Sequence, residues 1–146
     1  MAENEIMIDA SPEEVWAVLA DPQTFDDWVL GAQNVRDADD SWPAVGSKLH
    51  HSTGVGPLTV DDETRVEEAV PPTRLVLLAK VGPIGEFRIT LELRGADGQT
   101  TLFMQEDPVG GVAAHTPGTD SAITARNTIS LGRLKKLAEG TATARP

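Results

Sequence analysis

Apolar residues recur at helical spacing over the last part of the chain, from residue 120 to residue 139. Five of them share one face of the expected helix: Ile123, Leu131, Leu134, Leu137 and Ala138. Asn127 falls within this apolar stripe, and Ser130 lies at its edge. A buried amide without a partner costs about 1–3 kcal/mol. We therefore expect Asn127 to face a cavity that holds water or a ligand; the alternative is a bond to a nearby loop backbone.

The N-terminal part of the chain predicts a strand followed by two short helices. Ile6 and Ile8 alternate with polar neighbours, which is typical of a strand. In Ser11-Pro12-Glu13-Glu14, the serine can cap a helix, the proline can take its first position and the last glutamate can complete a capping box. A second helix start follows at Asp21-Pro22, and Trp28 lies in the apolar segment behind it. We expect two short helices joined end to end.

From about residue 33 the apolar residues alternate with polar ones, which predicts six strands. The strands are expected near residues 33–38, 47–53, 58–68, 74–81, 86–94 and 99–107. Residues 110–119 predict a loop, and Gly140 is expected to end the last helix before a frayed tail at 141–146. The order predicts one α+β domain over residues 1–146, ordered from about 3 to 140, with helices on one face of an antiparallel sheet.

The alternation within residues 86–94 predicts which side chains face the interior. Its apolar residues share one face: Phe87, Ile89, Leu91 and Leu93. A two-residue turn at Asp97-Gly98 places Leu91 opposite Met104 and Ile89 opposite Glu106. Glu106 is then on the inner face, where a carboxylate needs a partner. The alternative is that Glu106 lies at the strand end, where the sheet opens to water.

The same alternation places the histidines on the strands. If Lys48 points outward, Leu49 and His51 point inward. A four-residue loop at 54–57 would set Leu49 opposite Asp62 and leave His51 diagonal to Asp62. His51 and Asp62 are therefore a candidate buried acid–base pair, and Glu106 is a third candidate catalytic group. The alternative is a hydrogen-bonded structural histidine.

Charge and composition argue against several classes of function. The 146 residues carry a formal net charge of −11, and the acidic excess lies in residues 1–70. An acidic half repels phosphate backbones, so nucleic acid is not an expected partner. The chain has no cysteine, no apolar run of about 18 residues and no basic leader segment. These features predict a cytoplasmic protein without a membrane span.

No motif for a metal ion or an organic cofactor is recognised, so neither is expected. His50 and His51 are adjacent on a predicted strand, point to opposite faces and cannot bind one metal ion together. Gly54 and Gly56 lack the third glycine and the following helix of a dinucleotide-binding loop. The basic residues of the last helix are expected mainly on its solvated face: Arg126, Arg133, Lys135 and Lys136.

Five short segments, in this order along the chain, resemble the START/birch-pollen-allergen superfamily, often called SRPBCC. They span residues 8–16, 19–22, 42–47, 71–75 and 125–135. Within the superfamily the chain is most similar to the polyketide cyclase/dehydrase and lipid-transport branch, over about residues 6–139. The resemblance implies a helix-grip fold, in which a curved seven-stranded antiparallel sheet surrounds the long C-terminal helix. It also implies two short helices after the first strand and a deep cavity between sheet and helix.

Three functions are compatible with these observations. Because the superfamily binds or moves hydrophobic molecules, we expect a lipid-, polyketide- or aromatic-like small molecule in the cavity. The expected lining is Trp28, Leu49, His51, Phe87, Ile89, Leu91, Met104, Glu106, Asn127, Ser130 and Leu131. The first alternative is a polyketide cyclase or dehydratase that uses the His51/Asp62 pair. The second is a protein–protein interaction module, in which the acidic half or a sheet edge docks a partner.

Overall fold

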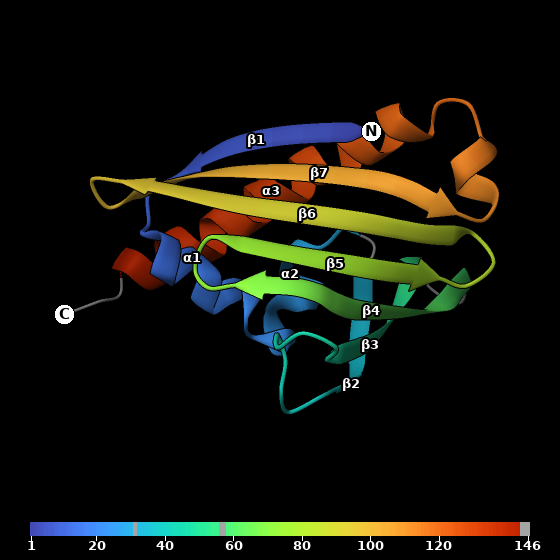
Figure 1. The fold of residues 1–146 in the computed structure, drawn as a ribbon, viewed down its shortest axis with the longest axis horizontal. Helices are drawn as coiled ribbons and strands as arrows, with labels where there is room; N and C mark the ends of the chain where they lie inside the picture. The colour runs from blue at the N-terminus through green and yellow to red at the C-terminus, as the bar shows by residue number, and fades with distance from the viewer. Residues whose placement is uncertain (31, 56–57, 144–146) are drawn as a thin grey trace.

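The computed structural model describes residues 1–30, 32–55 and 58–143, and within them one antiparallel sheet surrounds a long helix (Figure 1). The strands are β1 (Ala2–Ile8), β2 (Ala32–Ala38), β3 (Lys48–Val55), β4 (Leu58–Val70), β5 (Arg74–Val81), β6 (Gly85–Ala96) and β7 (Gln99–Gly110). The helices are α1 (Pro12–Leu19), η1 (Pro22–Thr24), α2 (Phe25–Trp28), η2 (Val112–His115) and α3 (Thr119–Thr143). The expected α+β helix-grip fold is confirmed.

The strand order is β1-β7-β6-β5-β4-β3-β2. The first strand therefore pairs with the last, and the other strands follow one another in sequence. In Figure 1, α3 lies behind β1, β7 and β6, and α1 and α2 sit beside it. One face of the curved sheet thus covers α3, and the space between the two can hold a core or a cavity.

Two local predictions of turn and cap chemistry are confirmed. Ser11 Oγ accepts the backbone N–H of Glu14 at 3.2 Å, and Glu14 Oε1 accepts the backbone N–H of Ser11 at 2.9 Å, which is a complete capping box. Asp97 and Gly98 have φ values of 55° and 78° between β6 and β7. This turn pairs Ile89 with Glu106, as expected.

The predicted register between β3 and β4 is wrong by two residues. The strands pair Val55 with Leu58, so the predicted four-residue loop is too long; Gly56 and Pro57 lie outside the described residues. His51 is therefore directly opposite Asp62, not diagonal to it. Strand alternation survives a shift of two residues, so both side chains still face the interior.

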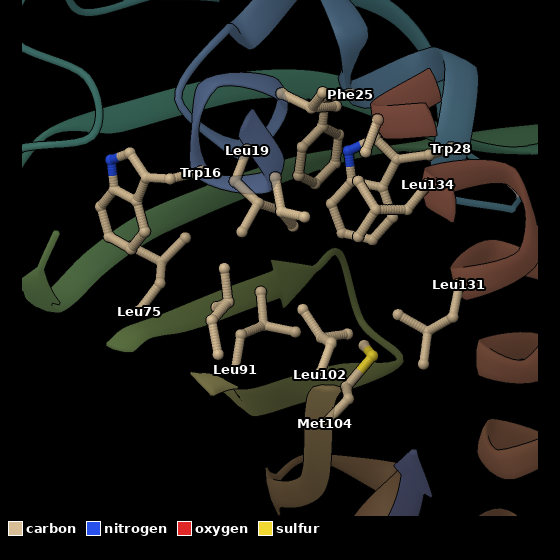
Figure 2. Close-up of a cluster of buried hydrophobic side chains, with 14 of the residues drawn as sticks. Trp16, Leu19, Phe25, Trp28, Leu75, Leu91, Leu102, Met104, Leu131 and Leu134 are labelled. Carbon is tan, nitrogen blue, oxygen red and sulfur yellow. The ribbon is translucent and has the colours of Figure 1, made fainter. Parts of the chain in front are cut away.

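The core lies between α1, α2, α3 and the central strands. Figure 2 shows Phe25 and Trp28 of α2 beside Leu134 of α3, above side chains from the sheet. The Phe25 and Trp28 rings meet edge to face, with centroids 5.8 Å apart. Leu134 is fully buried. This cluster attaches both helices to the sheet.

The C-terminal half of α3 differs from its prediction in two ways. The helix continues through Gly140 to Thr143, so Gly140 is not its end, and residues 144–146 lie outside the described part of the chain. Thr141 Oγ1 donates to the carbonyl of Leu137, which helps to close the last turn. Lys135 does not simply face solvent: its Nζ donates to the carbonyl of Met7 and to Glu139. The Lys135 ammonium, helped by the Asp9 N–H, lowers the pKa of Glu139.

The loop expected at residues 110–119 is largely replaced by secondary structure. β7 continues to Gly110, η2 follows at once, and α3 begins at Thr119. Gly111 has a φ of 78°, and a Cβ there would collide with the backbone of Gly85. The backbone N–H of Ala113 donates to the carbonyl of Ile84 at 3.0 Å. This close approach, which needs glycine, holds η2 against the turn before β6.

Candidate functional site

Two small inner chambers lie between the sheet and α3. Their volumes are about 40 and 30 Å³. Both are lined by Phe25, Val29, Ile89, Glu106 and Arg126. The larger chamber adds polar groups from β3 and β4, and the smaller one adds the polar residues of α3. The two chambers therefore flank the same pair of charged side chains.

Glu106 and Arg126 form the centre of this site. Glu106 is buried on the inner face of β7, as its strand register predicts, so the alternative of a strand end open to water is wrong. Arg126 Nη2 donates to both carboxylate oxygens of Glu106, at 2.8 and 2.7 Å. Asn127 Nδ2 donates to Glu106 Oε1 at 3.2 Å. Three charge-assisted hydrogen bonds thus satisfy a carboxylate that is only 1% exposed.

The expectation that Arg126 belongs to the solvated face of the last helix is wrong. Its side chain is 34% exposed, but the guanidinium reaches inward to the buried carboxylate. Arg126 lies one position before the stripe residue Asn127, and a long side chain can carry its charge from such an edge position to the interior. The Nε of Arg126 is buried and makes no hydrogen bond to the residues that the structure describes.

His51 and Asp62 face the larger chamber from paired positions on β3 and β4. His51 Nε2 lies 3.7 Å from Asp62 Oδ2 and 3.4 Å from Thr64 Oγ1. The His51 and Phe25 ring centroids are 4.7 Å apart. Both His51 and Asp62 are at least nine-tenths buried. Both side chains line the larger chamber, where they could hold or transfer a proton together.

The polar residues expected along α3 have different partners. Ser130 Oγ accepts the backbone N–H of Leu30 at 2.9 Å, which ties the segment after α2 to α3. Asn127 is bonded to Glu106 and not to a loop backbone. Both side chains, together with Trp28 and Met104, line the smaller chamber.

Three residues of the expected lining are placed in the core and not on the walls of these chambers: Leu49, Leu91 and Leu131. All three are fully buried or nearly so. Strand and helix periodicity shows which face a residue occupies, but it does not show where along that face the packing leaves space.

A larger outer pocket of about 580 Å³ lies where η2 and the first turns of α3 meet the turn before β6. It is lined by Pro83, Ile84, Phe87, Val112, Ala113, Thr116, Thr119, Ala122, Ile123 and Arg126. Arg126 is the one charged side chain among these described residues. Ile84 and Val112 are 47% and 68% exposed, so the pocket opens to solvent.

Phe87 and Arg126 separate the outer pocket from the inner chambers. Phe87 lines the outer pocket and the larger chamber, and Arg126 lines the outer pocket and both chambers. The polar groups His51, Asp62 and Glu106 lie beyond this partition. Of the residues expected to bind a ligand, only Phe87 therefore contacts the outer pocket; the other nine lining residues carry no pattern in the sequence that predicts this role.

The family model for "Polyketide cyclase / dehydrase and lipid transport" matches residues 2–139. The chain belongs to this family. In this chain the long C-terminal helix lies against the sheet, and the outer pocket and the inner chambers lie beside it. No curated protein matches the chain significantly.

Solved structures show the same fold at low sequence identity. The Zhui aromatase/cyclase from a Streptomyces species has a TM-score of 0.75 and 19% identity, over 98% of this chain and 95% of that chain. A protein from Rhodobacter sphaeroides has a TM-score of 0.70 and 23% identity, over 99% and 94%. A conserved protein from Geobacillus kaustophilus has a TM-score of 0.71 and 17% identity, over 95% of each chain. At these identities the likeness concerns the fold.

Among the residues that the structure describes, no group of three or more His, Asp or Glu side chains is arranged to hold a metal ion. Within the same ranges, no helix is both long and apolar enough to cross a membrane.

Proposed function

We propose that this protein binds a hydrophobic small molecule, lipid-, polyketide- or aromatic-like, in the outer pocket between the sheet and α3. The observation that carries the proposal is the pocket itself: about 580 Å³, an almost wholly apolar lining and one charged side chain, Arg126. Small-molecule sites are typically about 300–1,000 Å³, mostly apolar and equipped with few polar groups. The family description, which includes lipid transport and polyketide chemistry, supports the same class of ligand.

The inner chambers are too small for an organic ligand, so we place the proposed binding site in the outer pocket. Each chamber, at about 40 or 30 Å³, has room for about one water molecule, whose share of liquid volume is about 30 Å³. An organic ligand therefore needs the outer pocket for its apolar body. Arg126 is then the polar group that its inner end meets.

Filling the outer pocket should weaken ligand binding without disturbing the core. Ala122 is exposed on α3 and lines the pocket, so Ala122→Trp places an indole where the ligand body would lie. We expect the affinity for the neutral apolar dye Nile red to fall by at least about tenfold, because bulk excludes the ligand from its site. A fluorescence titration of dye against wild type and variant measures this change.

The matched control is Ala125→Trp, since Ala125 is also exposed on α3 but does not line the outer pocket. Its Nile red affinity should stay within about twofold of wild type. Equal losses in both variants, or no loss in Ala122→Trp, would contradict the proposed site. Native mass spectrometry of gently purified protein provides a second readout, in which a co-purified apolar compound is expected.

Catalysis of a cyclisation or dehydration is the second candidate function. It is favoured by the buried His51/Asp62 contact of 3.7 Å in the same chamber as Glu106. In the described conformation a substrate carbonyl cannot reach His51, because Phe87 and Arg126 intervene and the chamber is small. Loss of turnover of a β-keto substrate in His51→Gln, with Nile red binding retained, would support it; unchanged turnover would exclude His51. The other alternative, a protein–protein interaction module, stays a prediction from the sequence.

A further inference from the structure

The inner end of the outer pocket is formed by an arginine whose charge is already neutralised. We propose that the Glu106–Arg126 pair makes this pocket select hydrophobic molecules that end in an uncharged oxygen acceptor, such as a ketone, over molecules that end in a carboxylate. The inference rests on the proposed function, because it names the ligand class for the same pocket.

The need for an acceptor follows from the hydrogen bonds of Arg126. Its Nη2 is occupied by both oxygens of Glu106. Its Nε–H is buried and makes no hydrogen bond to any of the residues described. A buried donor without a partner is unfavourable, and an acceptor that supplies the missing bond is correspondingly favoured. Arg126 lines the outer pocket, so a small rotation of its side chain would bring this donor within reach of a ligand oxygen there.

The preference for an uncharged acceptor follows from the charges around Arg126. The ionised pair with Glu106 sums to zero, and Asp62 and His51 line the chamber behind it. With His51 neutral the four groups carry one net negative charge, and with His51 protonated they carry none. In neither state does the site offer an uncompensated positive charge. A carboxylate would lose its hydration without gaining a counter-charge, whereas a ketone loses much less.

A matched pair of ligands tests this selectivity. 2-Acetylnaphthalene and 2-naphthoate have nearly the same shape, and only the second is charged at pH 7.5. Their dissociation constants are measured by displacement of Nile red from wild type and from Glu106→Gln. We expect wild type to favour the ketone by at least about tenfold. Glu106→Gln should reduce this ratio by at least about tenfold, because Arg126 then lacks the carboxylate bonded to it and the net charge of the four groups rises by one.

The matched control is Asp107→Asn, which removes one negative charge from the adjacent position of β7. Asp107 is 38% exposed, lies 3.7 Å from the N-terminal ammonium and does not line the outer pocket. Its ketone-to-carboxylate ratio should match wild type. An equal change in Asp107→Asn and Glu106→Gln, or no change in Glu106→Gln, overturns the inference.

Thermal unfolding shows whether Glu106→Gln is still folded. A second variant keeps the inference testable if it is not. Glu106→Gln/Arg126→Gln removes both charges, so the ketone-to-carboxylate ratio should stay within about threefold of wild type. A tenfold loss of carboxylate affinity in this double variant would show that Arg126 attracts anions despite Glu106, and would overturn the inference. Failure of Nile red to bind wild type would instead refute the proposed function. Binding of Nile red that neither naphthalene displaces would refute only the selectivity.

Discussion

Arg126→Leu is expected to lower the free energy of unfolding by about 3 kcal/mol, because it leaves a buried carboxylate without its cation. Glu106 is only 1% exposed and receives two of its three hydrogen bonds from Arg126. The bond from Asn127 Nδ2 remains and compensates in part. Urea unfolding followed by tryptophan fluorescence and by circular dichroism measures the loss.

The double variant Glu106→Leu/Arg126→Leu tests whether the lost stability comes from an unpaired carboxylate or from lost packing of the arginine. Replacing both charges by apolar side chains removes the unpaired carboxylate, so most of the lost stability should return. Arg133→Leu is the control, since Arg133 is an exposed residue of the same helix, and its change should stay within about 0.5 kcal/mol. A double variant no more stable than Arg126→Leu would mean that the loss comes from packing of the arginine stem and not from the stranded charge.

Leu134→Ala is expected to cost about 2–5 kcal/mol, because it opens a cavity at the junction of α2 and α3. Leu134 is fully buried, and Figure 2 places it beside Phe25 and Trp28. These two aromatic residues also border the smaller inner chamber, so the rings can shift little into the new space without disturbing that chamber. The same urea measurement applies.

Ile129→Ala is the matched control for Leu134→Ala. Ile129 is an aliphatic residue of the same helix but is 50% exposed, so its truncation should cost less than about 1 kcal/mol. Similar losses for the two variants would contradict the conclusion that α3 packs on the core with the face that carries Leu134. The two variants differ little in helix propensity, so their difference reports burial.

Short-range rules account for the parts of this fold that were predicted correctly. The capping box at Ser11 and the turn at Asp97-Gly98 need only neighbouring residues to form, and both are present. Once the turn is placed, strand alternation carries Glu106 to the inner face. The same alternation places His51 inward even though the predicted β3–β4 loop was two residues too long. Periodicity on α3 likewise identified Asn127 as a buried polar residue.

The partners of those buried groups depend on distances between segments far apart in the chain. The contact of Glu106 with Arg126 joins β7 to α3, and Arg126 belongs to the exposed face by helical periodicity alone. The long, flexible side chain of Arg126 explains the difference. Its charged end can lie several ångströms from the backbone, so an exposed helix position can still place the charge in the interior.

The sequence by itself determined the order of the strands and main helices and the inner faces of the strands, because caps, turns and alternation act over a few residues. It also identified several buried polar residues, among them His51, Glu106 and Asn127. Tertiary structure alone decided where space remains. The outer pocket depends on η2 packing against the turn before β6, through the close approach of Gly85 and Gly111. No periodic pattern encodes such a gap, since it is the volume that the packed side chains of several elements leave unfilled.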